Sequence, residues 1–231
     1  PDVAKSTFLQ LCQTTRSECG ITSSGPAAVT SQTGILEKVV RWVADADVEI
    51  QSRWTDWNFL HVSTWDHNTI ANVPTVAAPS DLGVWDRESF YLDYSTANHK
   101  QLSVVDYKVW RRDLRQGVKT NQRPDSVIIL PDQSLRLEST PDSVYVLTAD
   151  YWKRPAKMTT NTAMSPVPEE YERIIIARAK IAYAESQGAP EVLMSAQIEF
   201  DDLLDKLESK YLPNQEGRRQ ADPGMMVVRP E

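Results

Sequence analysis

Residues 144–158, VYVLTADYWKRPAKM, constrain the fold more than any other stretch of this chain. From Val144 to Trp152 the apolar side chains fall on both faces of an extended run, so we expect a strand that is at least partly covered on each side. Pro155 ends the run because proline lacks a backbone donor and keeps Arg154 extended. The stretch predicts a strand at the end of a sheet, followed by a different kind of structure.

That different structure is helical. Pro166 and Pro168 suit the start of a helix, and Glu169 and Glu170 favour its positive end. Apolar spacing predicts helices over residues 5–18, 34–57, 169–187 and 191–212. The stripe of the second runs from Ile35 through Trp42 and Trp54 to Trp57, and the last two helices must pack antiparallel because only two or three residues separate them.

The middle of the chain, residues 61–152, changes character. Prolines separate short alternating runs, which predict antiparallel strands interrupted by one short helix near residues 106–115. Pro-Asp pairs at 124–125, 131–132 and 141–142 each introduce a strand, so we expect a meander of three. In the second of these strands Leu135 and Leu137 alternate with polar residues, which indicates one face in water.

These patterns predict the α+β class: a helical bundle from the N- and C-terminal helices, an inserted antiparallel β region and an extended C-terminal tail. We expect N-terminal bundle helices at 1–60, the β-rich insertion at 61–156, a helical hairpin at 157–212 and the tail at 213–231.

Composition excludes several classes of protein. A net charge of −7 argues against a protein that coats nucleic acid, although DNA can still pass by such a surface. No apolar run approaches the roughly 18–20 residues of a membrane span, and no signal-peptide pattern is present. About 10 Å of helical rise separates Cys12 from Cys19, which argues against a disulfide between them and favours a reducing, cytosolic site of assembly.

Catalytic and metal motifs are missing from the sequence. The histidines His61, His67 and His99 are scattered, and no glycine-rich phosphate loop or nucleophile elbow occurs. The acidic row at Asp201, Asp202, Asp205 and Glu208 interleaves with a leucine stripe, which favours a solvated helix face over paired catalytic carboxylates. We therefore expect no enzyme, no cofactor and no metal.

Two segments are candidate interaction surfaces. The first is the basic helix with Trp110, Arg111, Arg112 and Arg115, which either touches DNA phosphate or is a surface helix, anchored by Val109 and Trp110, that pairs with acidic neighbours or another protein. The second is the apolar end of the tail. It either adds to another subunit, for instance as an extra strand, or is a disordered terminus with incidental apolar residues. Its candidate interface residues are Met225, Met226, Val227, Val228 and Arg229.

The order of several segments resembles the head-to-tail adaptor proteins of tailed bacteriophages. These are SxFLQLCQ and ECGI near the start, SGPxxVTSQTG before ILEKVVRWVADADVEIQ, the following DWNFL, ILPDQSLRLESTPDSVYVLTADYWKRP, and PVPEEYERIIIARAKIAYAE. The resemblance covers nearly the whole chain. It rests on architecture and loose patterns, and the family has no residue-level site to transfer.

The resemblance implies a virion protein at the neck, assembled in the host cytoplasm. It implies a ring of copies, commonly twelve, beneath the portal protein and above a tail or nozzle protein, with genomic DNA passing through its centre. In related adaptors the C-terminal segment reaches the portal, which suits the tail here. The alternatives are a nucleic-acid- or carbohydrate-binding module centred on Trp110 and, less favoured, a phage hydrolase.

Overall fold

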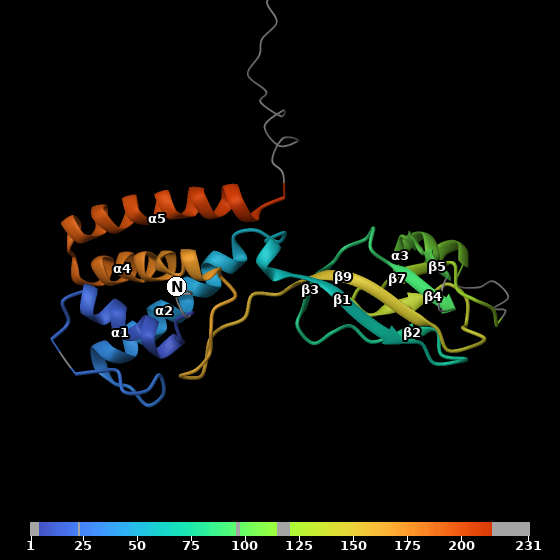
Figure 1. The fold of residues 1–231 in the computed structure, drawn as a ribbon, viewed down its shortest axis with the longest axis horizontal. Helices are drawn as coiled ribbons and strands as arrows, with labels where there is room; N and C mark the ends of the chain where they lie inside the picture. Colours follow the sequence, from blue (N-terminus) through green and yellow to red (C-terminus); the bar gives the residue numbers. More distant parts are fainter. Residues whose placement is uncertain (1–4, 23, 96–97, 115–120, 214–231) are drawn as a thin grey trace, which may run out of the picture. The chain divides into compact units, whose positions relative to one another are not determined.

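The computed structural model describes residues 5–22, 24–95, 98–114 and 121–213, and the chain divides into two compact units. The long helices belong to one unit, Pro1–Phe59 with Ala156–Glu231, and the strands to the other, Leu60–Pro155 (Figure 1). The combination of helices and largely antiparallel sheets confirms the α+β class.

Helix α4 is the centre of the helical unit. The long helices are α1 (Phe8–Glu18), α2 (Gly34–Ser52), α4 (Arg173–Gln187) and α5 (Pro190–Tyr211), and α4 contacts each of the others (Figure 1). Its sequence predicts one apolar face, yet its buried side chains surround the axis: Ile174, Ile175, Ile176, Ala177, Ala179, Ile181 and Ala184. A helix packed against three neighbours has little surface left for water, so burial extends beyond the predicted stripe.

Helix α2 ends at Ser52, five residues before the predicted end at residue 57, so the prediction was wrong about where this helix ends. The chain leaves the helix after Ser52, and Trp57 folds back so that its indole Nε1 donates to the carbonyl of Ile50 over 3.1 Å. Trp57 is fully buried and stacks on Phe59, with 4.9 Å between ring centroids. Trp57 therefore packs into the same core as α2 although it lies outside the helix, and this is why the apolar spacing continues past Ser52. The 3-10 turn η1 (Asn58–Leu60) follows directly.

The predicted hairpin of α4 and α5 is confirmed. The two helices pack against each other along their length (Figure 1). Gly188 ends α4 with φ 65°, a left-handed conformation that glycine adopts without strain, and Pro190 is the first residue of α5. The 3-10 turn η3 (Glu169–Tyr171) precedes α4.

The other unit consists of two sheets. The first has the order β1-β9-β4-β5, with β3 also paired to β9, and the second has the order β2-β8-β7-β6. The strands are β1 (His61–Asn68), β2 (Thr75–Val76), β3 (Leu82–Trp85), β4 (Tyr91–Ser95), β5 (Asn98–Gln101), β6 (Ser103–Val105), β7 (Ser126–Ile129), β8 (Leu135–Leu137) and β9 (Val146–Lys153). One apolar core includes side chains from both sheets, among them Leu92, Val127, Leu137 and Leu147.

The predicted meander of three strands is wrong. Strands β7 and β8 do pair antiparallel, but β9 belongs to the first sheet, where it pairs with β1, β3 and β4. Because Leu137 and Leu147 face one shared core, the chain crosses from one sheet to the other between them. The all-antiparallel prediction also fails at one place, since β6 and β7 are parallel and the segment with α3 (Tyr107–Val109) and the π-helical turn η2 (Trp110–Leu114) joins them.

The strand end predicted at Pro155 is confirmed, since β9 stops at Lys153. Before α4 the chain then continues as an irregular segment with a turn, in which the N–H of Ala163 donates to the carbonyl of Thr160 over 3.1 Å. The backbone N–H of Phe8 donates to the carbonyl of Ala163 over 2.7 Å, and that of Val29 donates to Oδ1 of Asn161 over 2.7 Å. This connecting segment, residues 156–168, thereby ties α1 and the loop after it to the rest of the bundle.

Candidate functional site

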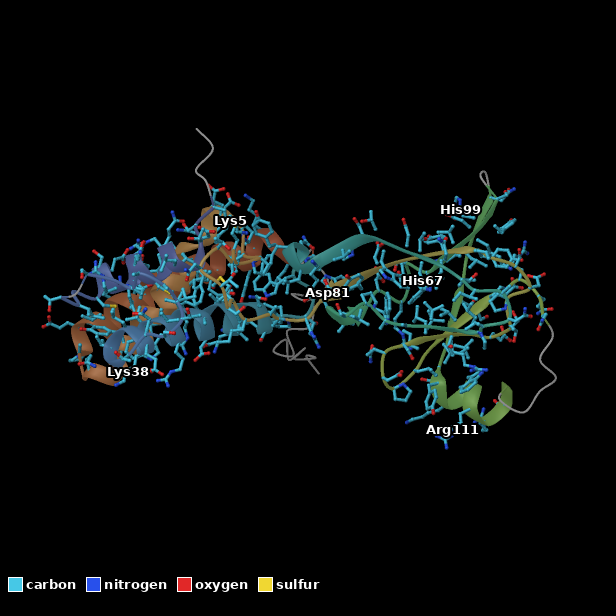
Figure 2. All side chains as sticks on the ribbon, turned by 90° about the horizontal axis from the view of Figure 1, so that it is seen from below. Lys5, Lys38, His67, Asp81, His99 and Arg111 are labelled. Atoms are coloured by element: carbon cyan, nitrogen blue, oxygen red, sulfur yellow. The ribbon has the colours of Figure 1, made fainter. Side chains whose placement is uncertain are left out.

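The basic helix predicted from the sequence is a short helical turn on the β unit, formed by α3 and η2. Asp106 caps it, because its Oδ1 accepts from the N–H groups of Lys108 at 2.8 Å and Val109 at 3.4 Å. Trp110 is buried and anchors the turn, whereas Val109 is 42% exposed, so the prediction that Val109 is a second anchor was wrong. Arg111 and Arg112 are exposed, and Arg111 extends from this turn in Figure 2.

An open hollow of about 670 Å³ adjoins the turn. Its lining comes from Tyr107, Trp110 and Arg111 on the turn and from Leu130, Pro131, Asp132 and Arg136 on and around the β7–β8 hairpin. The guanidinium of Arg136 lies 5.0 Å from the centre of the Trp110 ring, a cation–π arrangement. Its Nε is buried and has no hydrogen-bond partner among the described residues.

The cations of this region differ in how far acidic groups neutralise them. Arg112 forms two hydrogen bonds of 2.7 Å to the carboxylate of Asp113, which lower the pKa of that carboxyl. Arg111 instead donates to the hydroxyl of Tyr107 over 3.3 Å, and no carboxylate pairs with it in the part of the chain that the structure describes. The positive charge at the hollow is therefore that of Arg111 and Arg136, and the carboxylate of Asp132 in the same lining offsets part of it.

The structure thus brings together Trp110 and Arg111 of the predicted set and adds Arg136. The alternation of β8 correctly places Arg136 opposite the buried leucines, but its approach to Trp110 depends on the parallel β6–β7 pairing, which the sequence did not reveal. Arg115 and the tail residues Met225, Met226, Val227, Val228 and Arg229 lie outside the described residues. Their roles as interface residues stay predictions.

An ion-pair cluster joins three helices of the bundle. Arg173 and Lys180 of α4 both bind Glu18 of α1 and Glu199 of α5, with Lys180 Nζ 3.1 Å and 3.3 Å from the two carboxylates. Burial alone would raise the pKa of Glu18, but hydrogen bonds from Arg173 and Lys180 lower it below its ordinary value. Shared partners of this kind fix the three helices relative to one another.

The acidic row of α5 is largely a solvated face, as predicted. Asp201, Asp202 and Asp205 are exposed, whereas Glu208 contacts the segment after α2. Its Oε1 accepts from Nε of Arg53 at 3.0 Å and from the indole of Trp54 at 2.9 Å. This row has the geometry of a helix surface with one tertiary contact.

Reactive cysteine chemistry finds no support in the structure. Cys12 and Cys19 are free and buried, and burial raises the pKa of their thiols to about 12 and about 11. The thiolate, which is the nucleophilic form, is therefore scarce at neutral pH.

One group of side chains that sequence reasoning missed consists of His61, Asp86 and Asp150. Their ligand atoms all lie within 4.8 Å of one another. The residues are far apart in the sequence and meet only through the pairing of β1 and β3 with β9, so no short motif marks them. His67 and His99 lie elsewhere on the β unit (Figure 2).

The fold and these surfaces are consistent with a protein that assembles with others. A family model described as SU10 adaptor protein matches residues 6–228. The chain belongs to the SU10 adaptor protein family. A comparison with curated proteins gives no match.

Membership of the SU10 adaptor family makes the chain a bacteriophage structural adaptor and a component of the virion, which interacts with other phage structural proteins. The family indicates a structural role for the chain. No helix among the described residues is long and apolar enough to cross a membrane.

Proposed function

We propose that this SU10 adaptor is a head-to-tail connector, which forms a ring beneath the portal, joins the capsid to the tail and lets the genome pass. The observation that carries the proposal is the family match over residues 6–228. The partners are the portal protein, a downstream tail or nozzle protein and further copies of the chain, twelve in the ring, at the virion neck after assembly in the host cytoplasm.

The helical unit suits lateral contacts between copies. The cluster of Glu18, Arg173, Lys180 and Glu199 holds α1, α4 and α5 in one arrangement, and a head-to-tail contact between rigid copies closes into a ring when its rotation fits. The side chains of Met194 and Ile198 on α5 are 63% and 67% exposed, so this helix still offers apolar surface for such a contact.

The net charge of −7 suits a passage for DNA. A strongly basic lumen would bind the phosphate backbone and slow its movement, whereas a chain with excess acidic residues binds it weakly. DNA is therefore proposed as cargo that crosses the ring without specific binding.

The tail provides the sharpest test of portal binding. Deletion of residues 222–231 removes the apolar cluster, and we expect at least a tenfold loss of affinity for purified portal rings, because about 1.4 kcal/mol of lost contact already gives tenfold. Surface plasmon resonance with immobilised portal measures the change. A matched control replaces the polar Asn214 and Gln215 with serine and should bind as the wild type does; equal binding by the deleted chain would contradict the role of the tail.

The hollow beside Trp110 is proposed as a contact for an acidic segment of a neighbouring virion protein. The groups that would bind carboxylates are the Arg136 side chain over Trp110 and the guanidinium of Arg111, which has no carboxylate partner among the described residues. We expect Arg111→Glu to reduce assembly with the portal and tail proteins, measured by co-sedimentation, while Arg112→Glu has a smaller effect because Asp113 already pairs with Arg112. Salt-sensitive binding of DNA that Arg111→Glu abolishes would instead favour the nucleic-acid alternative.

A further inference from the structure

His61, Asp86 and Asp150 form a compact set of metal-ligand types on the β unit. A histidine nitrogen and one oxygen from each carboxylate lie within 4.8 Å of one another, and Nε2 of His61 is 3.9 Å from Oδ2 of Asp150. All three side chains are half-buried; those of His61 and Asp150 are 28% and 33% exposed. The group is thus shielded from bulk water but remains reachable by an ion.

The pairing of the strands places the three side chains on one face of the sheet. In β9 the side chains of Ala149 and Tyr151 are buried in the core, so Asp150 points to the opposite face. Trp85 of β3 is opposite Tyr151, and Asp86, the next residue, therefore shares the face of Asp150. His61 of β1 is opposite Trp152 and shares that face as well.

The backbones of the two aspartates are held together by a serine hydroxyl. Oγ of Ser89 donates to the carbonyl of Asp86 over 2.9 Å and accepts from the N–H of Asp150 over 2.8 Å, while the N–H of Asp86 donates to the carbonyl of Asp150 over 3.0 Å. The His61 ring packs on Trp152 with 5.0 Å between centroids. The backbones of both aspartates and the ring of His61 are thus held by their neighbours before any ion arrives, and Oδ1 of Asp86 accepts from the N–H of Glu88 over 3.0 Å.

The charge of this group is poorly balanced by protein side chains. Over the described residues, no lysine or arginine forms an ion pair with Asp86 or Asp150, and His61 is the one basic group near Asp150. Two carboxylates this close repel each other unless a cation lies between them. The face also holds the indole N–H of Trp152, which is buried and has no partner among those same residues.

We propose that His61, Asp86 and Asp150 bind a divalent transition-metal ion of the Zn²⁺ class. One imidazole nitrogen and two carboxylate oxygens are ligands that Zn²⁺ accepts, with water completing a tetrahedral shell. The imidazole favours such an ion over Mg²⁺, which prefers oxygen alone and keeps its waters. The ion would connect β1, which begins the unit, to β9, which ends it, and to the turn after β3, so it would act as a structural clamp.

Calorimetric titration of the EDTA-treated full-length chain with ZnCl₂ tests the proposal. We expect one ion per chain and a rise in the thermal unfolding midpoint in its presence. His61→Ala and Asp86→Asn should abolish both effects. Ser89→Ala, which leaves all three ligands in place, should weaken binding by about tenfold because the positions of the aspartates loosen.

The matched control is His99→Ala, which removes an exposed histidine of the same unit and should bind Zn²⁺ as the wild type does. Circular dichroism of each variant shows that loss of binding is not loss of fold. Absence of one-to-one binding by the wild type, or unchanged binding by His61→Ala, would overturn the proposal. Equal affinity for Mg²⁺ and Zn²⁺ would overturn the choice of ion.

Discussion

Asp47, a buried carboxyl on α2, makes the stability of the helical unit depend on pH. It accepts hydrogen bonds from the hydroxyl of Ser165 and from the amide of Gln51, the latter over 2.8 Å. Burial nevertheless raises its pKa from 3.8 to about 6, because the hydrogen bonds offset only part of the desolvation. The native state therefore binds this proton more tightly than the unfolded state does.

A raised native pKa gives stability that is fully present below the unfolded value and is lost as pH rises through the native value. For Asp47 that window runs from about pH 4 to above pH 6. We expect the unfolding free energy of the wild type, relative to that of Asp47→Asn, to fall by about 3 kcal/mol between pH 3 and pH 7, since each pKa unit corresponds to about 1.4 kcal/mol. Urea titrations at a series of pH values measure the difference.

Asp45→Asn is the control for this comparison, because Asp45 lies on the same helix but is exposed and pairs with Lys157. It removes an exposed carboxyl from the same helix, so comparison with it separates the effect of a buried carboxyl from that of a lost surface charge. Parallel curves for Asp47→Asn and the wild type would show that the pKa of Asp47 is the same in the native and unfolded states, which would contradict the prediction.

Single residues also show how far a sequence pattern extends. Trp57 lies on the apolar stripe of α2 and is buried as predicted, yet it is outside the helix. The spacing of apolar residues indicates which side chains reach the core. It does not indicate whether the backbone between them is helical, because a large side chain such as tryptophan can reach the core from a turn.

At the scale of elements, the approach of β3 to the end of β9 depends on Gly83. A Cβ at this position would lie 2.9 Å from the backbone nitrogen of Arg154 and 3.0 Å from the carbonyl carbon of Lys153. Backbone atoms cannot move aside as a flexible side chain does. We expect Gly83→Ala to lower the unfolding free energy by about 1–3 kcal/mol, as overpacking does in cores, measured by urea denaturation.

Gly25→Ala is the matched control, because a Cβ there would meet Leu36 at an ordinary 3.4 Å. Its effect should be smaller than that of Gly83→Ala. If Gly83→Ala is as stable as the wild type, β3 and β9 are farther apart in solution than the structure places them.

The elements themselves were largely predictable, and their pairing was not. The strand that ends before Pro155 and the hairpin at Gly188 follow from local chemistry, namely a missing donor and a left-handed backbone. The predicted meander of three strands was wrong because the alternation of buried and exposed side chains along β9 would be the same in either sheet. Sheet membership is decided by the shared core around Leu137 and Leu147, which depends on contacts far apart in the sequence.

Of the candidate sites, the one formed by neighbouring residues was predictable from the sequence, and the one formed by distant residues was not. A contiguous run of charges revealed the turn with Trp110 and Arg111, whereas His61, Asp86 and Asp150 are separated by 25 and 64 positions (86 minus 61 and 150 minus 86) and meet only in the folded sheet. A ligand set assembled from two strands and the turn after a third leaves no spacing signal in one sequence.

At the scale of the whole molecule, a helical unit and a β unit lie within one SU10 adaptor chain, and the family match spans both. Each unit buries side chains of its own, so each can offer a separate surface to another phage structural protein. The exposed apolar side chains of α5 and the arginines of the hollow are on different units, which suits a protein with more than one partner.

The most direct test of the connector proposal is electron cryomicroscopy of the intact virion neck. We expect density for this chain as a closed ring of twelve copies directly beneath the portal, with the segment after Pro213 reaching the portal and an open central channel. Density for the chain at another place in the virion, or a neck in which the portal contacts the tail without it, would contradict the proposal.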